Sequence, residues 1–340
     1  MKSCNSRVGN RRVGDSLKAA LCGWLLLSAG LLLTGPAAAP NLSSANAGEI
    51  KTANPKDAEP QEKEVLRGPL LEIYAIDADG TNARKVAAVP KVPILNSPEI
   101  SPDGKWVAVD GWNWDQNSRD ARNLAVNLET GRVKDLGVGC MPTWSFDGKW
   151  IAYSKYAPEG GVFIRQVDGD EVRQIDPEGW GIQWSPDGFK LAFTRDGNII
   201  IYDFIGDVFR EIFPPNEHPY SYIYWNMKWS PDSKQICFKG RRSDKSIDFA
   251  IVSATPGMPK LGVICDGDGD DYNEDIGWHP EGTRVSLPRK ALAGRPGQIY
   301  EFNTDKGKPL VPLAGQPADR NNGGLCWSRD GKTLYFVSSK

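Results

Sequence analysis

The stretch IQWSPDGFKLAF, Ile182–Phe193, contains the turn Ser-Pro-Asp-Gly between two runs of apolar residues. Pro186 fixes φ at the second turn position, Asp187 is tolerated at the third, and Gly188 can take a positive φ. Apolar residues on both sides of such a turn are typical of two paired strands. The stretch therefore predicts a β-hairpin.

The same turn recurs along most of the chain. Six copies are spaced 40 to 49 residues apart, and their first turn residues are Ser101, Ser145, Ser185, Ser230, His279 and Ser328. Repeats of this length are typical of propeller blades or solenoid units. Each copy is accompanied by a second strand pair, and these pairs cover residues 71–86, 123–136, 162–175, 199–212, 248–264 and 298–313. Two hairpins in each repeat predict six four-stranded sheets.

The order of the two kinds of hairpin indicates how the array is closed. The repeats start with a second-type hairpin, residues 71–86, and end with a first-type hairpin, residues 325–338. Pairing of these halves into one blade would remove the exposed sheet edges that an open array leaves. The sequence thus predicts an all-β, six-bladed β-propeller closed by its N- and C-terminal half-blades.

The repeat carries a resemblance to a known family. Trp-Ser-Pro-Asp-Gly-Lys is followed by a small residue between large ones, as at residues 107–109, 151–153 and 191–193. This pattern resembles the WD40-like PD40 repeats of TolB-type propellers, and it covers residues 70–340. TolB has a further N-terminal domain and prolyl-oligopeptidase relatives have a C-terminal hydrolase domain. Neither is expected in this chain, so the resemblance implies a stand-alone propeller at residues 69–340.

Four turns depart from the repeat. Phe146 and Arg329 replace the turn proline, His279 replaces the first serine, and Ser233 replaces the glycine. A serine at a position of positive φ would be strained. We therefore expect the turn that contains Ser233 to be of a different type.

The N-terminal residues have the layout of a secretory signal peptide. Basic residues precede an apolar stretch at residues 19–33, and small residues follow at 37–39 and 45–47. An uncleaved anchor is the alternative, but the stretch is shorter than the about 18 residues that a span needs. We expect a signal peptide at residues 1–39, or to 47, and a flexible tether at residues 48–68. The protein would then be periplasmic or secreted, with no integral membrane segment after cleavage.

The net charge of the chain limits its possible partners, and its cysteine content limits its possible disulfide bonds. Cleavage after Ala39 would move the formal net charge from −2 to −6, which argues against a nucleic-acid partner. The cysteines beyond the signal are predicted to be small packed residues, with one pair, Cys237 and Cys265, as the disulfide to test. We expect a monomer.

Catalytic motifs are not evident in the sequence. The turn aspartates recur at one repeat position, so turn chemistry explains them. The two histidines are His218, in a loop, and His279, in a turn. The first hypothesis is a binding module for a protein, peptide or glycan of the cell envelope. The alternative is a periplasmic propeller enzyme of the lyase or lactonase type, with its active site on the face of the ring that carries the long loops.

No cofactor is expected, with Ca²⁺ as the one exception. Asp266, Asp268 and Asp270 have the one-three-five spacing that lets carboxylates converge on a hard cation. A glycine is missing where an EF-hand needs it, at Asp271. A solvated acidic loop is the alternative.

The long loops are the predicted binding region. In a four-stranded blade the short turns lie on one face of the ring, and the mid-blade and inter-blade loops lie on the other. Irregular loops rich in Trp, Tyr and Arg are where binding energy concentrates. The candidate binding residues are Trp112, Trp114, Trp180, Tyr220, Tyr222, Arg241 and Arg242. The alternative is that Trp112, Trp180 and Tyr224 fold inward and fill the bases of the loops.

Overall fold

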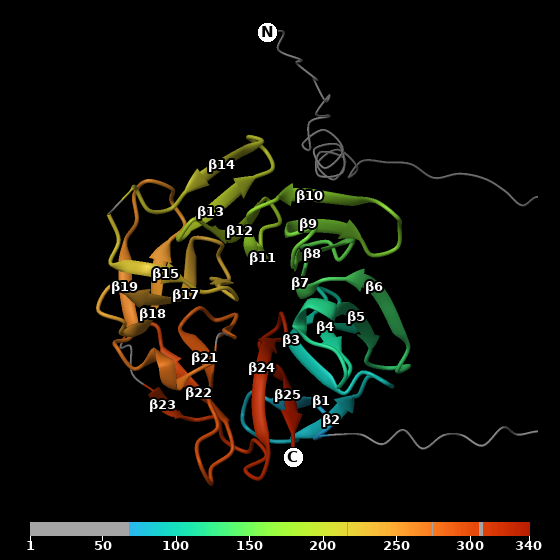
Figure 1. Ribbon diagram of the computed structural model, residues 1–340. Helices are drawn as coiled ribbons and strands as arrows, with labels where there is room; N and C mark the ends of the chain where they lie inside the picture. The colour runs from blue at the N-terminus through green and yellow to red at the C-terminus, as the bar shows by residue number, and fades with distance from the viewer. Residues whose placement is uncertain (1–67, 216, 274, 306–308) are drawn as a thin grey trace, which may run out of the picture.

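Six β-sheets surround a common axis in the computed structural model, which describes residues 68–215, 217–273, 275–305 and 309–340 (Figure 1). The predicted signal peptide and all but the last residue of the predicted tether lie outside the described residues. Each sheet is a blade of antiparallel strands, and consecutive blades are neighbours in the ring. The prediction of a six-bladed propeller is confirmed.

The strands follow the two hairpins of each repeat. Blade 1 comprises β3 (Ile94–Ile100), β4 (Trp106–Trp112), β5 (Arg122–Asn127) and β6 (Val133–Val138). Blade 2 comprises β7 (Cys140–Trp144), β8 (Trp150–Lys155), β9 (Gly161–Gln166) and β10 (Val172–Asp176). Blade 3 comprises β11 (Trp180–Trp184), β12 (Lys190–Arg195), β13 (Asn198–Asp203) and β14 (Val208–Glu211).

In blade 4 the innermost strand is split in two. This blade comprises β15 (Tyr220–Ile223), β16 (Lys228–Trp229), β17 (Gln235–Arg242), β18 (Ile247–Ser253) and β19 (Leu261–Cys265). Blade 5 comprises β20 (Gly277–Trp278), β21 (Arg284–Arg289), β22 (Gln298–Asn303) and β23 (Pro309–Pro312). Two short 3₁₀ helices, η1 (Ser118–Asp120) and η2 (Gly269–Asp271), lie in connecting loops.

Blade 6 joins the two ends of the described chain. Its strand order is β2 (Arg84–Ala87), β1 (Glu72–Asp77), β25 (Thr333–Ser339) and β24 (Asn321–Trp327). The register places Glu72 opposite Ser338 and continues to Asp77 opposite Thr333. The Arg320 guanidinium adds an ion pair of 2.8 Å to Glu72 at this junction. The predicted closure by terminal half-blades is confirmed.

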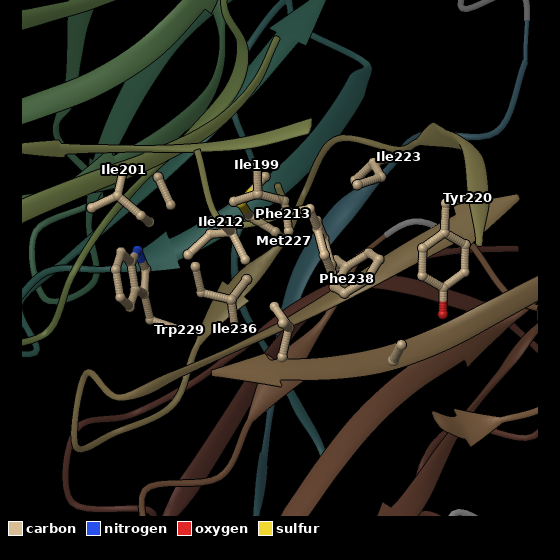
Figure 2. Packing of buried hydrophobic residues seen from close by; sticks show 13 residues of the cluster. Ile199, Ile201, Ile212, Phe213, Tyr220, Ile223, Met227, Trp229, Ile236 and Phe238 are labelled. Atoms are coloured by element: carbon tan, nitrogen blue, oxygen red, sulfur yellow. The ribbon is translucent and has the colours of Figure 1, made fainter. Parts of the chain in front are cut away.

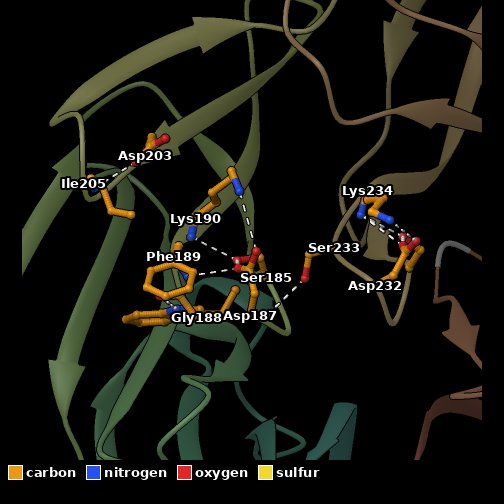
Figure 3. Close-up of polar contacts among 12 residues, drawn as sticks. Ser185, Asp187, Gly188, Phe189, Lys190, Asp203, Ile205, Asp232, Ser233 and Lys234 are labelled. Atoms are coloured by element: carbon orange, nitrogen blue, oxygen red, sulfur yellow. Dashed lines mark hydrogen bonds and ion pairs between the residues drawn. The ribbon is translucent and has the colours of Figure 1, made fainter. Parts of the chain in front are cut away.

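A shared hydrogen-bond pattern explains why the turn is repeated. Ser185 Oγ donates to Asp187 at 2.6 Å and accepts from the Lys190 N–H at 2.9 Å (Figure 3). The Gly188 N–H donates to the Ser185 carbonyl at 2.9 Å. The same Ser-to-Asp bond forms in the turns that begin at Ser101, Ser145, Ser230 and Ser328. The recurring aspartates therefore hold the turns in shape.

The prediction of a different turn type at Ser233 was wrong. Its N–H donates to the Ser230 carbonyl at 2.9 Å, the same closing bond as at Gly188, and its φ is 60°. The Ser233 hydroxyl accepts a hydrogen bond of 3.0 Å from the Asp187 N–H in the preceding blade (Figure 3). This contact between blades offsets the strain of a left-handed serine, a compensation that the local sequence did not reveal.

Apolar side chains fill the space between blades. Figure 2 shows the cluster between blades 3 and 4, which includes Ile199, Ile201, Phe213, Met227, Trp229, Ile236 and Phe238. Some of the repeat tryptophans also donate hydrogen bonds to a neighbouring blade: Trp229 Nε1 donates to the Gln183 carbonyl at 3.2 Å, and Trp144 Nε1 donates to the Glu99 carbonyl at 3.0 Å. The cysteines Cys140, Cys237, Cys265 and Cys326 are buried with free thiols.

Candidate binding site on the loop face

The ring has two distinct faces. Each innermost strand ends at a Ser-Pro-Asp-Gly-type turn, so these turns share one face, here named the turn face. The connections between the second and third strands of blades 1 to 5, and those from one blade to the next, lie on the opposite face, here named the loop face. The longer connections, such as residues 113–121 and 266–276, belong to the loop face.

An arc of aromatic side chains crosses the loop face from blade 1 to blade 4. We name it the aromatic arc, and it comprises Trp112, Tyr156, Trp180, Tyr222, Tyr224 and Trp225. The ring centroids of Tyr156 and Trp180 are 4.5 Å apart. Tyr224 lies 5.9 Å from Trp225 and 4.9 Å from Tyr222 by the same measure. The arc thus continues through four consecutive blades.

Two backbone features bring the arc together. Gly181 has a φ of 70°, and a Cβ at this position would lie 2.6 Å from the Trp225 Cβ. Glycine is therefore required for the close approach of blades 3 and 4. Asn226 also has a positive φ of 61°, where the innermost strand of blade 4 is interrupted between β15 and β16. This interruption turns Trp225 toward blade 3.

Arginine side chains cover two of the tyrosine rings. The Arg241 guanidinium carbon lies 5.3 Å from the Tyr222 ring centroid, and the two residues are cross-strand partners. Arg119 lies 5.8 Å from the Tyr156 ring centroid. Tyr222 is 37% exposed, and both arginines are exposed. Exposed arginine and tyrosine side chains in this arrangement are common at protein interfaces.

The seven predicted binding residues fall into separate groups. Trp112 and Trp180 share one half-buried cluster, and Tyr222 and Arg241 form the exposed pair described above. Trp114 lies apart, against Gly68 at the start of the described chain. Tyr156 and Trp225 were not among the candidate residues; Tyr156 directly follows β8, and Trp225 lies two residues after the end of β15.

The remaining two predicted residues meet at a buried carboxylate. Tyr220 is only 5% exposed, and its hydroxyl donates to Asp248 at 3.2 Å. Arg242 donates to Asp248 at 2.8 Å and to Asp266 at 2.9 Å. Tyr220 is thus part of the core. Asp248 was not among the candidate residues.

The acidic loop directs its carboxylates to different partners. Asp266 pairs with Arg242, and Asp270 pairs with Lys290 at 2.8 Å. Asp268 accepts from the Cys265 thiol at 2.8 Å. In the described part of the chain, no group of three or more His, Cys, Asp or Glu residues could hold a metal ion. Calcium binding by this loop stays a prediction from the sequence.

A buried carboxyl group lies beneath the blade 1 end of the arc. Asp110 is 4% exposed, accepts a hydrogen bond of 3.3 Å from the Met141 N–H, and faces Asn123 in the strand register. Burial is the largest cause of the shift that raises the pKa of Asp110 to about 6. Both amide atoms of Asn123 are buried without a partner in the described part of the chain.

The raised pKa predicts a pH-dependent difference between the protein and its Asp110→Asn variant. The folded carboxyl holds its proton up to about pH 6, whereas the unfolded one loses it near 3.8. Asp110 therefore lowers the free energy of unfolding progressively as pH rises from about 4 to 6, and above that range the total loss is about 3 kcal/mol. Urea unfolding at pH 4.5 and 7.5 should show the variant gaining stability relative to the parent at the higher pH. An identical pH response of both proteins would contradict this prediction.

A hollow of about 450 Å³ lies beside the arc between blades 1 and 2. Its walls include Arg119, Val138, Tyr156 and Pro158. This part of the loop face is thus concave, with apolar and aromatic walls and with Arg119, Lys155 and Glu159 as its charged residues. Such a shape suits a protruding side chain or loop of a partner.

None of the helices in the described residues reaches the length and hydrophobicity that crossing a bilayer requires.

No protein-family model and no curated protein matches the chain. Solved structures do resemble it, and these likenesses concern the fold.

A TolB candidate from Agrobacterium tumefaciens superposes with a TM-score of 0.61 at 18% identity, over 80% of this chain and 99% of that one. TolB from Acinetobacter baumannii gives a TM-score of 0.55 at 16% identity, over 72% of this chain and 64% of that one. A chain of a nidogen/laminin complex gives 0.52 at 12% identity, over 78% of this chain and 98% of that one. The protein therefore has the fold of TolB-like six-bladed β-propellers.

Proposed function

We propose that the protein is an exported binding module that holds a protein or peptide on its loop face. The observation that carries this proposal is the aromatic arc, with its exposed Tyr222–Arg241 pair and the adjoining hollow. Tyrosine, tryptophan and arginine supply most of the binding energy at protein interfaces. Export is proposed from the signal-like residues 1–39.

The enzyme alternative gains no support from the two histidines. His279 Nε2 lies 3.1 Å from the Gly331 carbonyl inside a turn, and its ring packs against Trp327. His218 packs against Phe213, and burial lowers its pKa. In the described part of the chain, the His279 ring bonds the Gly331 carbonyl and the Glu281 N–H, and His218 Nδ1 is buried without a hydrogen-bond partner. A binding role therefore accounts for more of the loop face than a catalytic one does.

Affinity capture tests the proposed face. We expect the immobilised Tyr222→Ala/Arg241→Ala double variant to retain at least about tenfold less partner from envelope extract than the parent, because it removes the exposed aromatic–arginine pair of the aromatic arc. The matched control is Phe189→Ala/Arg132→Ala, since these exposed residues lie in turns of the opposite face. Mass spectrometry of the retained material would quantify both.

Two outcomes would contradict the proposal. One is undiminished capture by the loop-face variant together with loss of capture by the turn-face control. The other is capture that survives protease treatment of the extract but is lost after periodate oxidation, since this would identify a glycan as the partner.

A further inference from the structure

Two of the residues that depart from the repeat meet on the turn face. The Arg329 guanidinium carbon of blade 6 lies 4.9 Å from the Phe146 ring centroid of blade 2, and Arg329 Nη2 donates to the Phe146 carbonyl at 3.3 Å. The two residues are 183 positions apart in the chain. The other four turns have proline at this position: Pro102, Pro186, Pro231 and Pro280. The Phe146–Arg329 pair thus replaces two prolines in an otherwise regular ring.

The pair stands at the edge of a hollow in the centre of the turn face. This hollow has a volume of about 380 Å³. Its walls are formed by the repeat tryptophans Trp144, Trp184, Trp229, Trp278 and Trp327 and by the turn prolines. Glu99 of blade 1 and Lys228 of blade 4 also line it, and their side chains form an ion pair of 2.5 Å between opposite blades. The ion pair forms a floor across the ring axis.

The two cationic side chains that line the hollow, Lys228 and Arg329, differ in their ion pairing. Lys228 is neutralised by Glu99. Arg329 contacts a carbonyl and an aromatic ring, and the ion pairs of the described residues give it no carboxylate. Partial removal from water lowers the pKa of its guanidinium, which means that the cation is less well solvated than a free arginine. An anion at this rim would therefore be attracted by an unneutralised positive charge.

The apolar part of the hollow sets the second requirement for a ligand. Phe146 is 52% exposed although it is a large apolar residue, so one face of its ring is open to a partner. Together with the proline rings and the indole edges, it provides apolar contact next to the guanidinium. A ligand that satisfies both features has an apolar body and a carboxylate within reach of Arg329.

We propose that this hollow binds an apolar carboxylate, the chemistry of a peptide C-terminus that ends in an aliphatic or aromatic residue. The carboxylate replaces the Phe146 carbonyl as the acceptor for Arg329, and the apolar side chain lies between Phe146 and the tryptophan walls. A charge-assisted hydrogen bond from an arginine to a carboxylate is shorter and stronger than one between neutral groups. The site is on the opposite face from the aromatic arc and does not depend on it.

Titration with defined probes tests the site. Acetyl-Ala-Ala-Leu with a free carboxylate should change the intrinsic tryptophan fluorescence saturably and give heat in calorimetry. The same peptide as its C-terminal amide should bind at least about tenfold more weakly, because it lacks the charge-assisted hydrogen bond. Acetyl-leucine separates the two sources of this chemistry: weaker binding than the tripeptide indicates a peptide terminus, and equal binding indicates a small free carboxylate.

The variants use residues that the fold already accepts. Arg329→Pro and Phe146→Pro restore the residue that four other blades have at this position, so folding should be preserved. Each should weaken binding of the free-acid tripeptide at least about tenfold. Arg295→Gln, at an exposed arginine in a loop-face connection, is the matched control and should bind like the parent. Equal binding of acid and amide, unchanged binding by Arg329→Pro, or no binding of the acid would overturn the proposal.

Discussion

Deletion of residues 321–340 should leave the chain without a folded propeller. The deletion removes β24 and β25, which are two of the four strands of blade 6, and leaves β1 without its six-residue register with β25. Leu334 and Phe336 are completely buried, and each contributes about 1.5–3 kcal/mol by its burial. Several such losses exceed the about 5–15 kcal/mol that stabilises a typical domain.

The exposed edge adds a second reason for the expected loss. Without β25, the backbone groups of β1 and the apolar cluster of Ile76, Leu313 and Ile299 would face solvent. Unpaired edges of this kind pair with other chains. The truncated protein should therefore be found in the insoluble fraction, whereas removal of the exposed Lys340 alone should leave solubility and melting temperature unchanged. A soluble monomer of the long truncation, with the parent's melting temperature, would show that closure does not hold the ring.

The architecture could be predicted from the sequence because it depends on local patterns that repeat. The turn that begins at Ser185 has the same hydrogen bonds wherever its residue types recur. Closure could be predicted because the repeats start with a second-type hairpin and end with a first-type hairpin. Neither inference needed any knowledge of contacts between distant residues.

The candidate site was less predictable because it depends on such contacts. Tyr220 and Tyr222 are two positions apart, yet an irregularity in the register between them buries the first and exposes the second. The Phe146–Arg329 contact joins blades 2 and 6, and the departures from the repeat indicated only that both positions were unusual. The local sequence does not indicate which long side chains come into contact across the ring.

Asp248 is the clearest example of a residue whose role only the structure reveals. Its side chain is completely buried and accepts hydrogen bonds from the Tyr220 hydroxyl at 3.2 Å, Arg242 Nε at 2.8 Å and the Gly267 N–H at 3.0 Å. It therefore connects β15, the end of β17 and the start of the acidic loop. The exposed Tyr222–Arg241 pair lies on the same two strands.

Asp248→Ala is expected to lower the free energy of unfolding by about 3–5 kcal/mol, because it leaves a charged donor and two neutral donors without their acceptor. Asp266→Ala is the matched control, since Asp266 is the second carboxylate on Arg242 but its side chain is 76% exposed. Its loss should cost at most about 1 kcal/mol. Urea unfolding of the three proteins compares these values directly, and equal losses in both variants would refute the role given to Asp248.

Because Asp248 anchors the strands that present Tyr222 and Arg241, its replacement should also reduce partner capture under conditions where the Asp266 variant still captures fully.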